Sequence, residues 1–184
     1  MNKIFHFSLI FYIFFFFLNI ETYYGRVIII RNNDENFNNF KNIINTNQDD
    51  KNGLIIKFED MVYDMTKIGY SNDITVNYNI TFIGNSKGTL FDFKNEKQGA
   101  FTFIFPQKKT KLTITFENII FDNLGNILDY IALFMIKFSI NDNGNHNIII
   151  NNCAFRNNHF PILNIQTDTA AIKLSVIFNN CKFL

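Results

Sequence analysis

The sequence predicts an all-β fold, a parallel β-helix in which short strands stack into a solenoid. A ten-position phrase recurs three times, at residues 114–123, 148–157 and 176–183. Short β-rich runs separated by turn residues also follow one another from Leu54 onward. The repeats are unevenly spaced, with 34 and then 28 residues between equivalent Asn residues. A solenoid tolerates such spacing because insertions leave through its turns.

The recurring phrase reads apolar, any, apolar, any, Asn, Ile or Cys, any, Phe, any, Asn. Its apolar residues keep one parity up to the first Asn and then switch, which predicts a bend there. We expect Asn118, Asn152 and Asn180 to face inward at this bend and to stack as a hydrogen-bonded ladder at the strand spacing of about 4.7–4.8 Å. Two flanking stacks are expected on the same grounds: Ile119, Cys153 and Cys181, and Phe121, Phe155 and Phe183.

Residues 1–25 are predicted to be a signal peptide. Lys3 precedes an apolar stretch that runs from Ile4 to Ile20, which matches a charged n-region and an h-region. Gly25 is the one small residue well placed for cleavage. The apolar stretch also reaches the lower end of the roughly 17–25 residues that a membrane helix needs. The alternative is therefore an uncleaved anchor, and the expected location is secreted or cell-surface.

Residues 26–53 are predicted to hold a strand and a capping helix. Val27–Ile30 is a short β-branched strand, and Asp34 can cap a helix after it. The helix would place Phe37, Phe40, Ile43 and Ile44 on one face. Because the first coil of a solenoid needs a cover for its open apolar end, this helix is expected to be that cover.

Residues 54–184 are predicted to form the coils, apparently truncated at the C-terminus. The expected strands are 54–58, 74–78, 89–93, 101–105, 112–116, 162–165 and 174–178. The span 127–140 fits helix or strand on periodicity alone, and we predict strand. No polar cap follows the last repeat at Phe183-Leu184. We therefore expect its apolar edge to be exposed and prone to end-to-end association.

These features resemble the right-handed parallel β-helix superfamily, the pectate-lyase-like fold, whose members carry Asn ladders at a bend and stacks of aliphatic and aromatic side chains. The segments at 82–85 (Phe-Ile-Gly-Asn) and 155–158 (Phe-Arg-Asn-Asn) are also similar to the Phe-x-x-Asn element of polymorphic outer-membrane-protein repeats. The segment at 121–124 departs from that element. The resemblance implies a right-handed parallel β-helix with an N-terminal capping helix over roughly residues 54–184.

Charge and side-chain chemistry exclude several functions. The formal net charge is +1 and no block of like charge occurs, so nucleic acid is not an expected partner. Polysaccharide-cleaving members of the superfamily need clustered Asp, whereas Asp49-Asp50 lie in a polar loop, and Asp122 and Asp142 have no evident carboxylate partner. His146 and His159 are interpreted as structural. We predict no catalytic, metal or cofactor site.

The sequence contains two candidate modification sites. Cys153 and Cys181 hold the same position in successive repeats, so they form either a buried reduced pair or a disulfide. The strand spacing lies within the ~4.4–6.8 Å window for Cα atoms of a disulfide, but it keeps the Cβ atoms farther apart than such a bond prefers. Asn79-Ile80-Thr81 is an N-glycosylation sequon whose Asn79 is expected to point outward.

The most economical hypothesis is a secreted or cell-surface, non-catalytic β-helix that presents a surface for adhesion, carbohydrate contact or assembly. Its expected partners are a carbohydrate, a cell-surface protein or a second copy bound at the C-terminal edge. One alternative is the N-terminal fragment of a β-helix polysaccharide lyase or hydrolase. Another is the start of the ectodomain of a longer membrane receptor.

Overall fold

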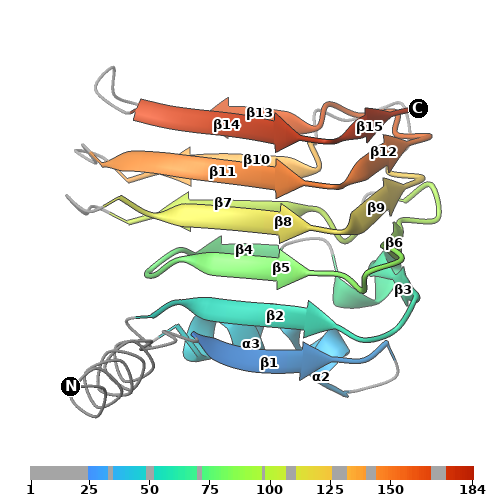
Figure 1. Ribbon diagram of the computed structural model, residues 1–184, viewed down its shortest axis with the longest axis horizontal. Coiled ribbons are helices and arrows are strands. Elements are labelled where there is room, and N and C mark those ends of the chain that lie inside the picture. Colours follow the sequence, from blue (N-terminus) through green and yellow to red (C-terminus); the bar gives the residue numbers. More distant parts are fainter. Residues whose placement is uncertain are drawn as a thin grey trace, which may run out of the picture.

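The computed structural model describes residues 25–32, 35–48, 52–69, 72–96, 98–106, 111–125, 132–139, 144–166 and 173–184. These residues form a parallel β-solenoid of about 4 turns, which confirms the predicted fold class (Figure 1). The predicted signal peptide lies outside the described residues except for Gly25, as do Asp34, Asp49, Asp50 and Asp142.

The described strands form three sheets in which every neighbouring pair is parallel. Sheet A contains β1 (Arg26–Ile30), β2 (Leu54–Phe58), β5 (Ile80–Ile83), β8 (Thr113–Glu117), β11 (Asn145–Asn151) and β14 (Lys173–Asn179). Sheet B contains β3 (Val62–Asp64), β6 (Thr89–Asp92), β9 (Ile119–Asp122), β12 (Ala154–Arg156) and β15 (Lys182–Phe183). Sheet C contains β4 (Asn72–Thr75), β7 (Phe101–Phe105), β10 (Phe134–Phe138) and β13 (Leu163–Gln166).

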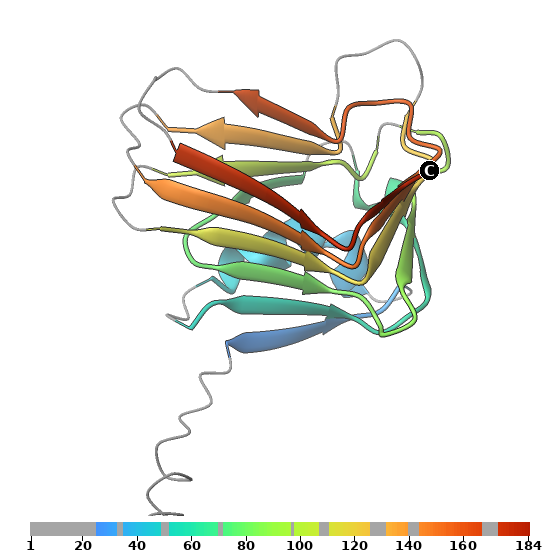
Figure 2. The ribbon, with the colours of Figure 1, turned by 45° about the horizontal axis from the view of Figure 1, so that its top comes forward.

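From β2 to β13 the chain passes through sheets A, B and C in that order in each coil, whereas the first described coil contributes only β1 and the last only β14 and β15. Seen from above, the chain runs counter-clockwise while it rises toward the viewer, so the solenoid is right-handed (Figures 1 and 2). The ambiguous span 127–140 contributes strand β10, while 126–131 lie outside the described residues. The strand expected at 74–78 instead spans Asn72–Thr75. Strands β3 and β5 and the 3-10 helix η1 (Met65–Ile68) were not among the expected elements.

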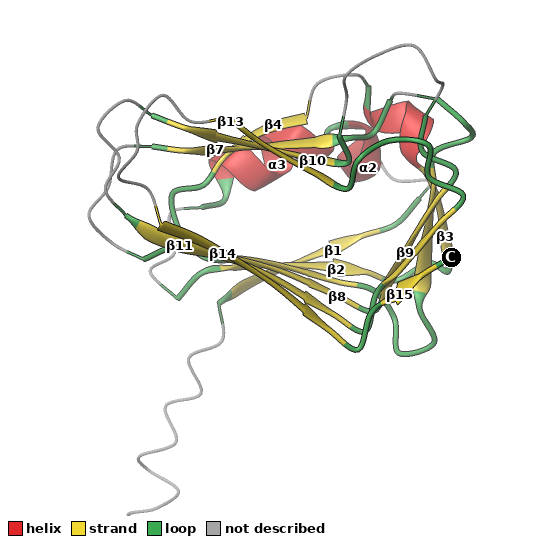
Figure 3. Ribbon diagram, turned by 90° about the horizontal axis from the view of Figure 1, so that it is seen from above, coloured by secondary structure: helices red, strands yellow, loops and turns green. Residues whose placement is uncertain are grey.

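The N-terminal cap consists of two short helices rather than the single helix expected. Helix α2 (Glu35–Asn38) and helix α3 (Phe40–Thr46) are separated at Asn39. Phe37, Phe40 and Ile44 are almost completely buried in the core. The Phe40 ring lies 6.0 Å from Phe58 and 5.9 Å from Phe101, measured between centroids. The helices lie under sheet C, where the first coil has no strand (Figure 3).

Helix α3 also satisfies the hydrogen-bonding groups along the free edge of β4. The side chain of Asn45 donates to the carbonyl oxygen of Asp73 (3.0 Å) and accepts from the backbone N–H of Thr75 (3.0 Å). Gln48 Oε1 accepts from the backbone N–H of Asn77 (2.8 Å). These amide side chains therefore replace the peptide groups of a neighbouring strand, which closes this end of sheet C.

The core is a set of aromatic columns along the solenoid axis. Because the strands are parallel and in register, the same core position recurs about one strand spacing away in the next coil. Phe121 stacks on Phe155 with centroids 5.1 Å apart, and Phe155 stacks on Phe183 at 5.3 Å, which confirms the expected Phe stack. Phe82 and Phe116 form a second stacked pair at 4.8 Å.

Candidate functional site: the open end of the solenoid

The last coil exposes side chains that are buried at the same position in the coils beneath it. Phe178 is 39% exposed, whereas its register partner Ile150 in β11 is 1% exposed. Phe183 is 57% exposed, whereas its partner Phe155 in β12 is 3% exposed. In the described part of the chain, β14 and β15 are the last strands of sheets A and B (Figure 2). Among the described residues, the interior-facing side chains of the last coil are therefore exposed. End-to-end association through this edge stays a prediction.

A pocket of about 340 Å³ lies at one corner of this open end. It is lined by Phe155, Asn158, Phe160, Ile162, Phe183 and Leu184. Leu184 is the most exposed large apolar residue described, and Ile165 in β13 is also exposed. The lining is thus mostly aromatic and aliphatic, with one amide side chain. An exposed apolar surface of this kind favours contact with another apolar surface.

The repeated Asn residues lie at the bend between sheets A and B, but on its outside. Asn118, Asn152 and Asn180 have φ angles of 58°, 52° and 52°, in the left-handed region that Asn adopts more readily than most residues. Asn152 and Asn180 are exposed and Asn118 is half-buried, so the inward orientation expected from parity is wrong. Asn180 Nδ2 donates to Asn152 Oδ1 (2.7 Å). A ladder through all three residues stays a prediction.

A second group of polar residues lies at the C-terminal ends of the sheet B strands. Asp92, which is largely buried, forms an ion pair with Lys94 (2.6 Å) and accepts a hydrogen bond from Asn123 Nδ2 (3.2 Å). Burial alone would raise the pKa of Asp92, but the hydrogen bonds from Lys94 and Asn123 outweigh it and hold the pKa below its ordinary value. The carboxylate therefore stays ionised and is engaged in structural contacts.

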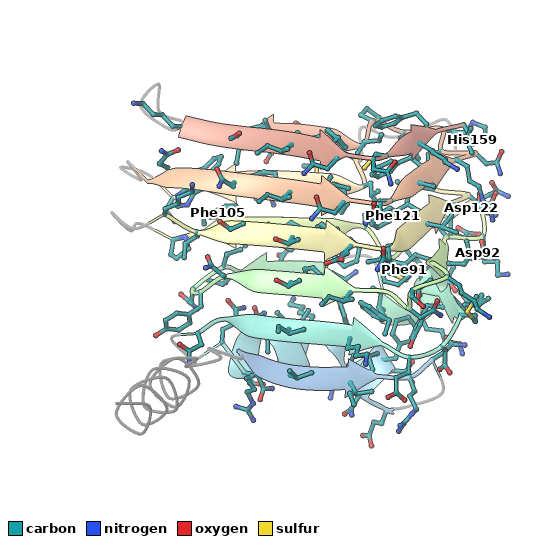
Figure 4. All side chains as sticks on the ribbon, viewed as in Figure 1. Phe91, Asp92, Phe105, Phe121, Asp122 and His159 are labelled. Carbon is teal, nitrogen blue, oxygen red and sulfur yellow. The ribbon has the colours of Figure 1, made fainter. Side chains whose placement is uncertain are left out.

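Asp122 repeats this arrangement one coil later. It pairs in register with Asp92, and Figure 4 shows the two residues one above the other. The expectation that Asp122 has no carboxylate neighbour is therefore wrong. Asp122 forms an ion pair with Arg156 (2.8 Å) and accepts from Asn157 Nδ2 (2.9 Å). Each carboxylate is thus held by an Asn in the left-handed conformation from the following coil, since Asn123 and Asn157 have φ angles of 59° and 50°.

His146 and His159, the two histidines interpreted as structural, have different surroundings. His146 is fully buried in the core, where its ring centroid lies 4.4 Å from that of Phe105. Its Nδ1 accepts a hydrogen bond from the backbone N–H of Leu112 (3.3 Å). His159 is exposed, and its backbone N–H donates to the carbonyl oxygen of Leu124 (3.0 Å) (Figure 4). In the described part of the chain, no group of three or more His, Cys, Asp and Glu is arranged to hold a metal ion.

The two cysteines are adjacent members of one column. Ala154 pairs with Ile120 below and Lys182 above, which places Cys153 between Ile119 and Cys181. Both thiols are free in the structure, with Cys153 buried and Cys181 half-buried. Burial raises the pKa of Cys153 to about 12. The choice between a reduced pair and a disulfide in solution stays a prediction.

Asn79, the sequon residue, is exposed at the start of β5 on the outer side of sheet A. Its Oδ1 accepts a hydrogen bond from the backbone N–H of Thr113 (2.8 Å). A shallow pocket of about 330 Å³ surrounds it, with Gly25, Gly53, Thr81 and Thr113 among the lining residues. The outward orientation expected for Asn79 agrees with this exposure. Its glycosylation stays a prediction.

Comparisons of the chain with protein-family models, with curated proteins and with solved structures find no match. No helix among the described residues has both the length and the apolar character needed to cross a membrane.

Proposed function

We propose that this chain is a secreted or cell-surface, non-catalytic β-helix that presents a surface for adhesion, carbohydrate contact or assembly, with the apolar side chains of the last described coil as part of that surface. The observation that carries this proposal is the exposure of Phe178 and Phe183, whose counterparts Ile150 and Phe155 are core residues. Covering such side chains is favourable by about 25 cal/mol for each Å² of apolar surface removed from water. In the described part of the chain, β14 and β15 each pair with one strand only.

The state of the polar side chains supports a role in binding rather than catalysis. The oxygens of Asp92 and Asp122 are occupied by Lys94, Arg156 and two Asn side chains. A general acid would need a carboxyl pKa raised toward neutrality, whereas the pKa of Asp92 is lowered. The charged n-region and apolar h-region at the N-terminus support secretion or anchoring at the cell surface.

We also propose kinship with the pectate-lyase-like superfamily and with polymorphic outer-membrane-protein repeats. The geometry of Asn158 in the Phe-x-x-Asn segment supports it. Asn158 Nδ2 donates to the carbonyl oxygen of Phe121 (3.1 Å), and its Oδ1 accepts from the backbone N–H of Leu124 (2.9 Å). One side chain thus joins the turns of two successive coils, which gives this segment a structural reason to recur.

Light scattering of the full chain, collected from the medium of a secretory host, tests the proposed function. We expect the average mass to rise with protein concentration. A Phe178→Ser/Phe183→Ser variant should lose this association. Ile29→Ser is the matched control, because Ile29 is exposed to a similar extent (42%) but lies on β1 at the opposite end. A chain that stays monomeric at high concentration contradicts the proposal.

A further inference from the structure

We propose that the outer face of sheet A holds a seat for the first sugar of an N-linked glycan on Asn79, an N-acetylglucosamine residue. This inference rests on the proposed function, because it needs a chain that is secreted or displayed at the cell surface and so meets the enzymes that add N-glycans. The seat is the pocket of about 330 Å³ that Asn79 lines. The sugar would lie along the protein surface instead of standing free in solvent.

Four polar side chains form a square on this face, which is turned toward the viewer in Figure 1. Thr81 in β5 pairs in register with Thr115 in β8. Asn79 and Thr113 each lie two residues earlier in the chain, so their side chains point to the same outer face. The corners of the square are about 4.8 Å apart across the strands and about 6.6 Å apart along them. Three Thr hydroxyl groups therefore lie close to a sugar attached to Asn79.

The orientation of the Asn79 amide directs the sugar toward β8. Its Oδ1 accepts a hydrogen bond from the backbone N–H of Thr113 (2.8 Å), which turns this oxygen toward β8. Glycosylation adds one carbon atom to Nδ2. An amide with one carbon substituent on nitrogen prefers the trans form, in which that carbon lies on the same side as the oxygen. The first carbon atom of the sugar is therefore placed on the β8 side of Asn79.

The pocket offers space next to Asn79 and uncharged partners for a sugar. Gly25 and Gly53 are among its lining residues and leave this part of the face without side chains. Gly53 has a φ angle of 92°, and a Cβ atom there would lie 2.9 Å from the carbonyl oxygen of Asn79. The described lining residues are all uncharged. N-acetylglucosamine is a neutral sugar with hydroxyl and amide groups, which the hydroxyl and amide side chains of the pocket can bind.

The covalent bond to Asn79 compensates for the shallowness of this pocket. A tethered group binds as part of the same molecule, at a high effective concentration, without the cost of bringing two molecules together. The contacts form only in the folded chain, where β5 and β8 lie side by side. Binding that occurs only in the folded state stabilises that state. The first sugar should therefore raise the thermal stability of the chain.

Thermal unfolding of three forms of the full chain tests the seat. The intact glycoprotein is collected from the medium of a eukaryotic host. The single-sugar form is the same protein after an endoglycosidase has left one N-acetylglucosamine on Asn79. The sugar-free form is secreted in the presence of an inhibitor of N-glycosylation and keeps an unmodified Asn79. We expect the first two forms to unfold at the same midpoint, and the sugar-free form about 2–4 °C lower.

Substitutions in the seat separate contact with the sugar from a general effect on the strands. Thr113→Val/Thr115→Val replaces two hydroxyl groups by methyl groups and keeps the sequon. It should abolish the difference in midpoint between the single-sugar and sugar-free forms, because the substitutions and the sugar are then coupled. Thr75→Val/Thr102→Val is the matched control. Both of these residues are half-buried on neighbouring strands of sheet C, so this variant should keep the difference.

Three outcomes would overturn the seat. They are a single-sugar form no more stable than the sugar-free form, a Thr113→Val/Thr115→Val variant that keeps the difference, and a secreted chain without a glycan. Each of these leaves the proposed function intact, because its light-scattering test depends on Phe178 and Phe183 in the last described coil. A chain retained in the cytosol contradicts the secreted location in the proposed function and removes the basis for the seat.

Discussion

The hydroxyl group of Tyr63 donates a 2.6 Å hydrogen bond to the carbonyl oxygen of Ile30, the last residue of β1. The same hydroxyl accepts a hydrogen bond from the backbone N–H of Asp60 (3.1 Å). The ring is fully buried, with its centroid 5.1 Å from the rings of both Phe37 and Phe58. This one side chain therefore joins β1, the capping helices and the second coil.

Replacing Tyr63 with Phe should destabilise the chain by about 1–3 kcal/mol, because it leaves buried backbone groups without their partner. The effect should depend on pH. Burial raises the pKa of Tyr63 to about 12, above its ordinary value of about 10. The folded chain therefore holds this proton where the unfolded chain has lost it. The stabilising contribution is complete below pH 10 and is lost as the pH rises through about 12.

Urea unfolding of both proteins between pH 8 and 12 measures this difference. Wild type should lose stability more steeply than Tyr63→Phe above pH 10, so the two curves should converge. Other groups that titrate in this range, such as Cys153, are present in both proteins and cancel in the comparison. Parallel curves would show that the Tyr63 hydroxyl does not titrate as the structure implies.

Asn45→Ala should destabilise the N-terminal cap by about 1–3 kcal/mol, because it removes the partner of two backbone groups on the edge of β4. Asn42→Ala is the matched control. Asn42 lies in the same helix but is exposed, and its side chain donates only to Asn39 among the described contacts. Urea unfolding gives both free energies. Equal losses in the two variants would mean that helix α3 is held by its apolar face alone.

The coils and the aromatic stacks could be predicted because they follow from local patterns. Alternating apolar residues such as Ile114 and Phe116 mark one buried face of a strand, and the recurrence of Phe121 and Phe155 fixes the stack. The break between the capping helices could not be predicted in this way. Phe37 and Phe40 fit a single helical face equally well, and only their contacts with the coils place the interruption at Asn39.

The orientation of the repeated Asn residues shows that the alternation of side chains along a strand cannot be extended across a bend. Phe116 and Ile119 are both buried, so the residues between them must cross a bend. Counting alternate residues assigns Asn118 to the inside. A single left-handed residue reverses the alternation, which places Asn118 on the outside. The pairing of Asp92 with Asp122 could not be predicted either. The register between two coils depends on the length and geometry of the turns, which differ from coil to coil.

The left-handed conformation of Asn152 predicts that Gly at this position gives a more stable protein than Ala. Asn152→Gly should be nearly neutral, whereas Asn152→Ala should cost about 1–2 kcal/mol, since a Cβ atom destabilises this conformation. Asn145→Ala in the extended strand β11 is the control and should have little effect. Denaturant unfolding ranks the three variants. If Gly is worse than Ala, the hydrogen bond from Asn180 rather than the backbone conformation explains the presence of Asn152.

Alkylation decides between the two states of the cysteines. In a reduced native chain, maleimide should label the half-buried Cys181 and leave the buried Cys153 unlabelled, because the pKa of Cys153 is raised to about 12. Denaturation should then expose Cys153 to the reagent. Cys181→Ser identifies the labelled site by mass spectrometry. A disulfide predicts the opposite behaviour, with neither cysteine labelled before a reducing agent is added.

Asn79 should carry an N-linked glycan when the chain passes through a eukaryotic secretory pathway. Its side chain is exposed, Oδ1 faces Thr113, and Thr81 supplies the hydroxyl group of the sequon. A glycosidase that removes N-glycans should therefore lower the mass of the secreted chain. Asn79→Gln and Thr81→Ala should each abolish this shift. Asn85→Gln is the control and should keep it, because Asn85-Ser86-Lys87 has no hydroxyl group at the third position. Secreted wild-type chain with no shift would refute the site, whereas chain retained in the cytosol would refute the predicted signal peptide.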